Sequence, residues 1–232
     1  MPKTASACSV VAAAFLACVG LASPTVGDAG RTAGLVEESQ SRRLLASLGE
    51  RVGAMPVAYA PVAAGGSARP IAGWVRFCRT YVDECRIDPA ERDTVRLTPA
   101  LWRAVNEVNS AVNAAITPLT DVEHCGELDR WDLAEDGTGD CEDYQLLKRR
   151  KLTMMGIPRR AMVMTVVLDE RNDGHAVLML RTDRGDLILD NKRDEILSWH
   201  RTGYVYVKRE SQTDLSWVSL NHVSGVGTTA SR

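Results

Sequence analysis

An apolar run without polar alternation, AMVMTVVL at residues 161–168, limits how this chain can fold. A strand with one solvated face alternates apolar and polar residues, so this run predicts a central β-strand covered on both faces. Short turns separate it from three further β-rich runs, HAVLMLR (175–181), DLILD (186–190) and GYVYVKR (203–209). These runs predict an antiparallel sheet.

Helices are predicted before these strands. Thr98 is a suitable N-cap, Pro99 fits the first helical position, and Pro118 ends the helix. Its apolar residues, at alternating steps of four and three, are Leu101, Val105, Val108, Val112 and Ile116. A second helix is predicted after Asp140. A helical N-terminal part followed by an antiparallel β-sheet, packed together, is an α+β domain.

Two polar features of these helices are interpreted as surface. The stripe formed by Asn106, Asn109 and Asn113 is a solvated or groove-lining face. The run KRRK (148–151) spreads around its helix and is interpreted as a solvated helix end that complements the helix dipole.

The first 22 residues predict a secretory signal peptide. Lys3 precedes an apolar run, 5–23, that is too short to span a bilayer comfortably, and Gly20-Leu21-Ala22 offers a cleavage site. An uncleaved anchor and a lipoprotein site at FLAC (15–18) are the alternatives. After cleavage we expect no stable membrane span and a periplasmic or secreted protein.

Cleavage removes one charged residue, Lys3, and takes the formal net charge from −2 to −3. A negative chain does not favour nucleic-acid binding.

Residues 23–70, rich in Ala, Gly, Ser and Pro, predict a flexible lead-in. We expect the folded domain at 71–220 and a disordered tail at 221–232.

Four cysteines remain in the mature chain: Cys78, Cys85, Cys125 and Cys141. They allow three full pairings in an oxidising compartment. Cys78 and Cys85 enclose only six residues and suit a local disulfide. A zinc site is the rival interpretation, but neither a CxxC pair nor clustered histidines support it.

Cys141 lies at the predicted start of a helix. Asp140 is a good N-cap and Asp143 resembles a capping-box partner. Free N–H groups and the helix dipole favour a thiolate there, which is the nucleophilic form. The alternative is a buried structural cysteine.

His175 and Asp190 give this cysteine two candidate partners. If residues 182–185 form the loop of a hairpin, Val177 pairs with Asp190, and His175 lies diagonal to Asp190 on the same face. Together they are the parts of a thiol acyl-transfer site. Asp190 as a mere turn former remains an alternative. Other histidines that could act as bases, but do not face a carboxylate at a strand end, are His124, His200 and His222.

The sequence resembles the bacterial transglutaminase-like cysteine peptidases over roughly residues 73–219. The resemblance is carried by GWVRFC (73–78), LTPALWRAVNEVNSAVNAAITPLTD (97–121), GDCEDYQLLKRRKL (139–152), GHAVLMLRTDRGDLILDN (174–191) and TGYVYVKRES (202–211). It implies a papain-like, transglutaminase-type core. The implied catalytic triad is Cys141, His175 and Asp190.

The resemblance also implies calcium dependence, with Asp140 and Glu142 as ligands. Its implied partners are a large surface adhesin as protein substrate and an inner-membrane cyclic-di-GMP receptor that holds the protease inactive. One departure concerns Cys125, which stands where the family has a tyrosine before Gly126, and its state, free or paired with Cys141, stays open.

The acids around Cys141 agree with a cation. Residues 131–143 contain no Lys or Arg, and their carboxylates are Asp132, Glu135, Asp136, Asp140, Glu142 and Asp143. Such a cluster opposes thiolate formation unless a cation neutralises it, and calcium takes several oxygen ligands. Asp136 and Asp143 are further ligand candidates. The match to an EF-hand loop is partial, because Ala134 occupies a ligand position.

The sequence thus predicts a calcium-dependent cysteine endopeptidase. A transglutaminase-type acyltransferase shares the same triad and differs only in using an amine in place of water. A non-catalytic calcium-binding interaction module is the alternative of a different class.

Overall fold

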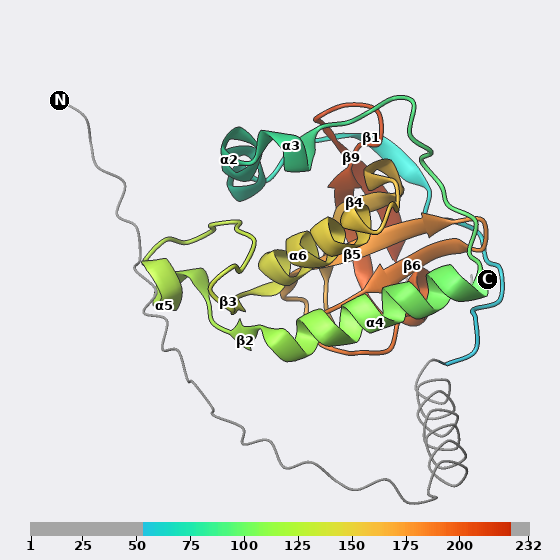
Figure 1. Ribbon diagram of the computed structural model, residues 1–232. Coiled ribbons are helices and arrows are strands. Elements are labelled where there is room, and N and C mark those ends of the chain that lie inside the picture. The colour runs from blue at the N-terminus through green and yellow to red at the C-terminus, as the bar shows by residue number, and fades with distance from the viewer. Residues whose placement is uncertain (1–52, 224–232) are drawn as a thin grey trace, which may run out of the picture. The chain divides into compact units, whose positions relative to one another are not determined.

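The computed structural model describes residues 53–223, within which a seven-stranded antiparallel sheet carries helices on one face (Figure 1). The strand order is β1-β9-β8-β4-β5-β6-β7. These strands are β1 (Ala64–Ala68), β4 (Met162–Leu168), β5 (Gly174–Thr182), β6 (Gly185–Leu189), β7 (Leu197–Ser198), β8 (Val205–Glu210) and β9 (Trp217–Val223). The predicted α+β class is confirmed.

The helices precede the main part of the sheet in sequence. They are α2 (Ala72–Thr80), α3 (Val82–Cys85), α4 (Pro99–Ala115), α5 (Asp121–Cys125) and α6 (Cys141–Met154). Two 3₁₀ turns follow, η1 (Arg159–Ala161) and η2 (Trp199–Arg201), and a small parallel pair joins β2 (Thr117–Pro118) to β3 (Thr138–Gly139). Helix α6 packs on β4 and β5, and α4 lies beside it (Figure 1).

The four strands predicted from apolar runs are all present as β4, β5, β6 and β8. Strand β4 is central, between β5 and β8, and buries both of its faces. Met162 and Met164 point into the core shared with the helices, whereas Val163 and Val167 belong to a second cluster on the other face. This two-sided burial explains why the run lacks polar alternation.

Helix α4 begins as the sequence predicted. Thr98 is the N-cap, and its hydroxyl accepts a hydrogen bond from the backbone N–H of Leu101 (3.1 Å). Pro99 is the first helical residue. The helix ends at Ala115, shortly before Pro118.

The predicted domain boundary at residue 71 is too late. Ala64–Ala68, placed by the sequence in a flexible lead-in, form the edge strand β1, which pairs with β9. The segment AGGSA has no apolar alternation, because β1 is held by backbone pairing and is largely exposed. Strand β9 runs on to Val223, past the predicted end of the domain at 220. The predicted signal peptide, the first part of the lead-in and residues 224–232 lie outside the described residues.

The described helices include none that is both long and apolar enough to cross a membrane.

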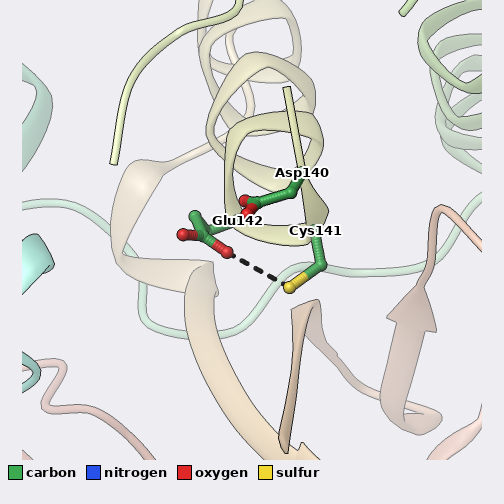
Figure 2. Close-up of side chains that lie close together, drawn as sticks. All are labelled: Asp140, Cys141 and Glu142. Carbon is green, nitrogen blue, oxygen red and sulfur yellow. Dashed lines mark hydrogen bonds between the residues drawn. The ribbon is translucent and has the colours of Figure 1, made fainter. Parts of the chain in front are cut away.

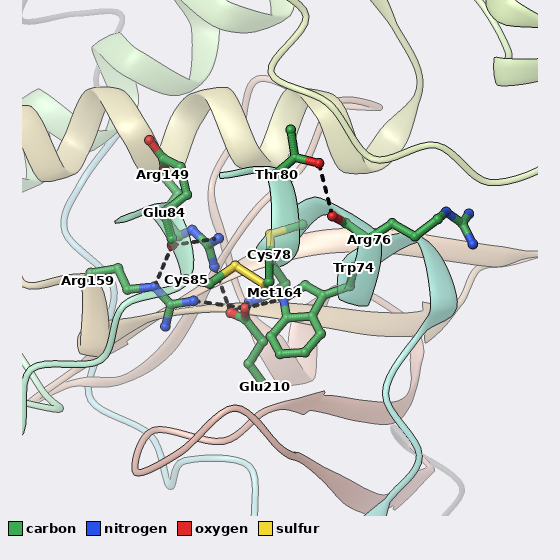
Figure 3. The surroundings of a disulfide bond; sticks show 10 residues. All are labelled: Trp74, Arg76, Cys78, Thr80, Glu84, Cys85, Arg149, Arg159, Met164 and Glu210. Atoms are coloured by element: carbon green, nitrogen blue, oxygen red, sulfur yellow. Dashed lines mark hydrogen bonds and ion pairs between the residues drawn. A yellow bond between two sulfur atoms is a disulfide. The ribbon is translucent and has the colours of Figure 1, made fainter. Parts of the chain in front are cut away.

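Cys78 and Cys85 form the predicted disulfide, which joins α2 to α3 (Figure 3). Cys125 and Cys141 are free thiols. The disulfide lies next to Glu84, whose backbone carbonyl accepts a hydrogen bond from Arg159 Nε at 3.0 Å. The crosslinked segment thus contacts the turn that leads into β4.

The interpretation of residues 148–151 as a solvated helix end is wrong for its first two members. Lys148 and Arg149 are fully buried. Arg149 Nη1 lies 2.7 Å from the Glu210 carboxylate, to which Arg159 Nη2 also donates at 3.0 Å (Figure 3). Helix α6 is enclosed on several sides, by the sheet, by α4 and by the α2–α3 segment, so a spread of basic residues around it does not imply exposure.

Candidate active site

Cys141 is the first residue of α6, and Asp140 before it has extended backbone angles (φ −112°, ψ −161°). The two oxygens of the Asp143 carboxylate accept hydrogen bonds from backbone N–H groups, Oδ1 from Asp132 (2.7 Å) and Oδ2 from Asp140 (3.3 Å). Asp143 therefore fixes the loop against the helix start, as its predicted capping role requires.

The Cys141 sulfur has two hydrogen-bond partners. The backbone N–H of Ala176 donates to Sγ at 3.4 Å, and the thiol donates to Glu142 Oε2 at 3.1 Å (Figure 2). Burial, followed by the Glu142 charge, raises the pKa of the Cys141 thiol well above its usual range, and Asp140 adds to the rise. Without a compensating charge, the acids outweigh the thiolate-favouring position at the helix start.

His175 and Asp190 meet as predicted. His175 is the second residue of β5 and Asp190 directly follows β6. The imidazole Nε2 lies 2.8 Å from Asp190 Oδ1, and both side chains are buried. Arg181 lies opposite Asp186 in the hairpin, and strand pairing ends at Leu178 and Leu189, one residue before the predicted pair of Val177 and Asp190.

Asp190 is held as a carboxylate by several donors. The Tyr204 hydroxyl donates to Oδ2 at 2.6 Å, and the backbone N–H of Lys192 donates to Oδ1 at 3.0 Å. Burial alone would raise the pKa of Asp190, but the hydrogen bond and charge of His175, together with these donors, lower it to about 2. Tyr204 was not identified from the sequence, because it lies in a β-rich run whose pattern does not mark it.

The Cys141 thiol lies next to the strand that carries the His175 imidazole. The amide that bonds Cys141 Sγ belongs to Ala176, the residue after His175. Because His175 Nε2 is bonded to Asp190, Nδ1 is the ring nitrogen left to exchange a proton. No hydrogen bond joins the thiol to the ring within residues 53–223, where the thiol proton is directed to Glu142 instead.

The other histidines have different surroundings. His124 Nε2 lies 2.7 Å from Asp136 Oδ2. His200 stacks on the Tyr59 ring, with centroids 3.6 Å apart. His222 lies in β9, on the far side of β8 from β4.

Two overlapping groups of acids surround the start of α6. Ligand atoms of Asp140, Cys141 and Glu142 lie within 4.8 Å of one another, and so do those of Asp121, Asp140 and Asp143. Asp140 Oδ1 is buried without a hydrogen-bond partner among the described residues. The sequence did not identify Asp121, because α5 reaches the site only through the fold.

The predicted ligand Asp136 lies outside both groups. Its oxygens are occupied by His124 and by the backbone N–H of Thr138. Of the four predicted ligands, Asp140 belongs to both groups, Glu142 to the first and Asp143 to the second.

The acidic groups carry more negative charge than their surroundings support. Burial, followed by the charge of Asp140, raises the pKa of Glu142 to about 9. Burial also raises the pKa of Asp143 to about 8, with Asp140 and Asp121 adding to it. Such a site takes up protons, or a cation of matching size.

A thiol at a helix start, beside a buried imidazole–carboxylate pair on a neighbouring sheet, is the arrangement of a cysteine peptidase of the transglutaminase-like class. The family described as "Bacterial transglutaminase-like cysteine proteinase BTLCP" matches residues 64–224. The chain belongs to this family and is a transglutaminase-like cysteine peptidase.

Among curated proteins, none matches the chain. The solved structure of Legionella pneumophila LapG is similar, with 26% identity over 53% of this chain and 71% of that one, and a TM-score of 0.45. Its calcium-bound form shows 25% identity over 58% and 76% of the chains, at the same TM-score of 0.45. Its EGTA-treated form shows 26% identity over 56% and 72%, again at a TM-score of 0.45.

Proposed function

We propose that this peptidase is a calcium-dependent endopeptidase that uses Cys141 as nucleophile, His175 as general base and acid, and Asp190 to orient the imidazole. The observation that carries the proposal is the buried hydrogen bond of 2.8 Å between His175 and Asp190. The residue after His175, Ala176, donates its backbone N–H to Cys141 Sγ, so this pair lies next to the thiol. This pairing fixes the tautomer of His175 and favours its protonated form during the reaction.

The reaction follows from these roles. His175 takes the thiol proton as Sγ attacks the peptide carbonyl, and the same proton then passes to the leaving amine. A thioester to Cys141 remains, and water activated by His175 hydrolyses it to release the acid and the free thiol. Asp190 stays ionised throughout and stabilises the imidazolium.

Calcium fits the acids beside the nucleophile. Asp140 Oδ1 has no hydrogen-bond partner among the described residues, and Glu142 Oε2 accepts the hydrogen bond of the Cys141 thiol. Asp143 uses both oxygens on backbone N–H groups, which favours Asp140 and Glu142 as ligands, with Asp121 near Asp140. Bound calcium would supply the positive charge that these carboxylates lack.

We place the enzyme in the periplasm. The disulfide between Cys78 and Cys85 is typical of proteins that fold in oxidising compartments. The predicted signal peptide at residues 1–22 supports export.

The proposed substrate is a protein, and the resemblance to the family motivates a large surface adhesin. It also motivates an inner-membrane receptor that regulates the enzyme. The test compares the secreted and surface proteins of cells that carry wild-type enzyme, Cys141→Ala or the control Cys125→Ala. We expect fragments that disappear in Cys141→Ala alone.

Other outcomes decide against parts of this proposal. Undiminished cleavage by Cys141→Ala excludes the peptidase mechanism. A labelled amine incorporated into the substrate, in place of a new N-terminus, shows an acyltransferase. No cleavage together with a thiol that resists alkylation favours a binding module.

The calcium part is tested with Glu142→Ala and the control Glu135→Ala, an exposed acid of the loop that precedes α6. Calorimetric calcium binding and peptidase activity are measured in chelator and after calcium is restored. We expect Glu142→Ala to lose both and Glu135→Ala to keep both. Magnesium should restore activity poorly, because it demands a tighter octahedral shell. Full wild-type activity in excess chelator excludes a calcium requirement.

A further inference from the structure

A group of polar side chains lies next to the proposed active site, where α4 meets the loop at residues 190–194. Asn113 Nδ2 donates to the backbone carbonyl of Asp190 at 3.0 Å, and Asn109 Nδ2 donates to that of Asp194, also at 3.0 Å. Helix α4 therefore holds the backbone of the loop that carries Asp190.

Helix α6 holds the same loop from its own side. Gln145 Nε2 donates to Asn191 Oδ1 at 3.3 Å. Lys148 follows one turn later and is fully buried. It lies two turns beyond Cys141, on the same side of the helix.

Four polar atoms of this group have no hydrogen-bond partner in the part of the chain that the structure describes: Asn109 Oδ1, Asn113 Oδ1, Gln145 Oε1 and Lys148 Nζ. The side-chain amide nitrogens of Asn109, Asn113 and Gln145 donate hydrogen bonds to the loop at 190–194. These hydrogen bonds orient each amide group and therefore its oxygen. Three acceptors and one ammonium with three donors match in number and kind. Leaving all four unpaired and buried would be costly, and buried water commonly bridges such groups.

We propose that Lys148 is a positioning residue of the active site, which donates through buried water to the amide oxygens of Asn109, Asn113 and Gln145 and so fixes the loop that carries Asp190. This inference rests on the proposed function, because it assigns Lys148 a role through Asp190. Lys148 itself touches neither substrate nor thiol.

Lys148 also places a charge near the triad. The carboxylates that face it are Asp190 and Asp194, whereas the members of the group from α4 and the rest of α6 are neutral amides. Burial lowers the pKa of Lys148 to about 7, so its charge is present on the acidic side of neutrality. The groups that face Asp190 directly are His175, Tyr204 and Arg193.

The sign of the electrostatic effect follows from these charges. A positive charge near Asp190 disfavours a second positive charge on His175. Replacing Lys148 by an apolar residue of similar length makes protonation of His175 easier. The acid limb of the pH–activity profile should then move to higher pH.

The test uses Lys148→Met with Lys151→Met as matched control, since Lys151 is an exposed lysine of the same helix. For Lys148→Met we expect kcat to fall about tenfold or more with KM little changed, because a misplaced Asp190 affects the chemical step. The acid limb should shift upward, amide hydrogen exchange at 190–194 should accelerate, and the melting temperature should not fall, because a buried lysine is removed. Lys151→Met should resemble wild type in all four.

Other results would overturn the inference. If Lys148→Met keeps wild-type kcat, acid limb and exchange at 190–194, Lys148 does not position the loop. If Lys148→Met does not fold, Lys148→Ala, which leaves the direct Asn109 and Asn113 hydrogen bonds to the loop in place, must show the loss of kcat and the faster exchange, or the inference fails. Failure of the proposed function is distinguishable, because wild type would then lack thiol-dependent cleavage while the exchange measurement still tests the loop.

Discussion

The Cys141 thiol donates a hydrogen bond of 3.1 Å to the carboxylate of Glu142, its neighbour in sequence. A peptidase thiol must instead give its proton to an imidazole, and His175 lies at the residue next to the Ala176 amide that bonds the sulfur. Glu142 therefore stabilises the protonated thiol in this arrangement. The reactivity of Cys141 depends on what neutralises or moves that carboxylate.

Removing the Glu142 charge should make the metal-free thiol more reactive. Above about pH 9, where Glu142 is ionised in the metal-free protein, Glu142→Gln lacks the negative charge that raises the pKa of Cys141, so more thiolate forms at a given pH. Each unit by which the pKa falls increases the thiolate fraction about tenfold while the thiol form dominates. The rate of Cys141 alkylation in chelator, resolved by peptide mass spectrometry, measures this. Glu135→Gln is the control, and equal rates in the two variants would contradict the prediction.

Tyr204→Phe should destabilise the protein by about 1.5–3 kcal/mol at pH 7, because Asp190 loses a donor at 2.6 Å. The pKa of Asp190 is about 2 in the folded protein and about 3.9 in an unfolded chain. Its stabilisation is therefore present above pH 4 and disappears as the pH falls towards 2. Urea unfolding at pH 7 and pH 3 should show the difference from wild type shrinking with acid. Tyr206→Phe, whose hydroxyl contacts Trp199 and Thr202, should show no such convergence.

The sequence predicts the strands and the catalytic pairing best where a local pattern encodes them. Strands β4, β5, β6 and β8 are apolar runs bounded by turns, and the hairpin register is sufficient to bring His175 and Asp190 together. Strand β1 escapes prediction because AGGSA contributes backbone pairing and little side-chain burial. A pattern of side chains cannot identify such a strand.

The residues missed at the site share a different cause. Asp121 and Tyr204 reach Asp140 and Asp190 from elements distant in sequence, so neither contact follows from spacing. The burial of Lys148 depends on α4 and the loop at 190–194 closing over α6, which helical periodicity does not reveal. Tertiary enclosure therefore decides which polar residues act at the site.

Glu210→Gln should destabilise the protein by about 3–5 kcal/mol, because it leaves two buried guanidinium groups with a neutral partner. The Glu210 carboxylate accepts from Arg149 Nη1 (2.7 Å) and Arg159 Nη2 (3.0 Å), and it connects α6 to the sheet and the turn before β4. Chemical denaturation of the purified protein measures the loss. Asp173→Asn, at an exposed ion pair with Arg171, should change stability by less than about 1 kcal/mol. Similar losses of unfolding free energy in both variants would show that the buried ion pairs of Glu210 contribute no more to stability than an exposed pair.

Relative to Lys148→Met, the free energy of unfolding of wild type should rise with pH between about 7 and 10. The variant is the reference because Glu142 and Asp143, which titrate in the same range, are common to both proteins. The pKa of Lys148 is about 7 in the folded protein, whereas that of an unfolded chain is about 10.4, so in this window the unfolded chain holds a proton that the native protein has released. This difference between wild type and Lys148→Met increases by up to about 1.4 kcal/mol per pH unit, and it levels off below and above the window. Denaturation curves across this range should show wild type and Lys151→Met gaining stability relative to Lys148→Met as the pH rises. Parallel curves for wild type and Lys148→Met would mean that Asp190 and Asp194 keep the lysine protonated in the fold.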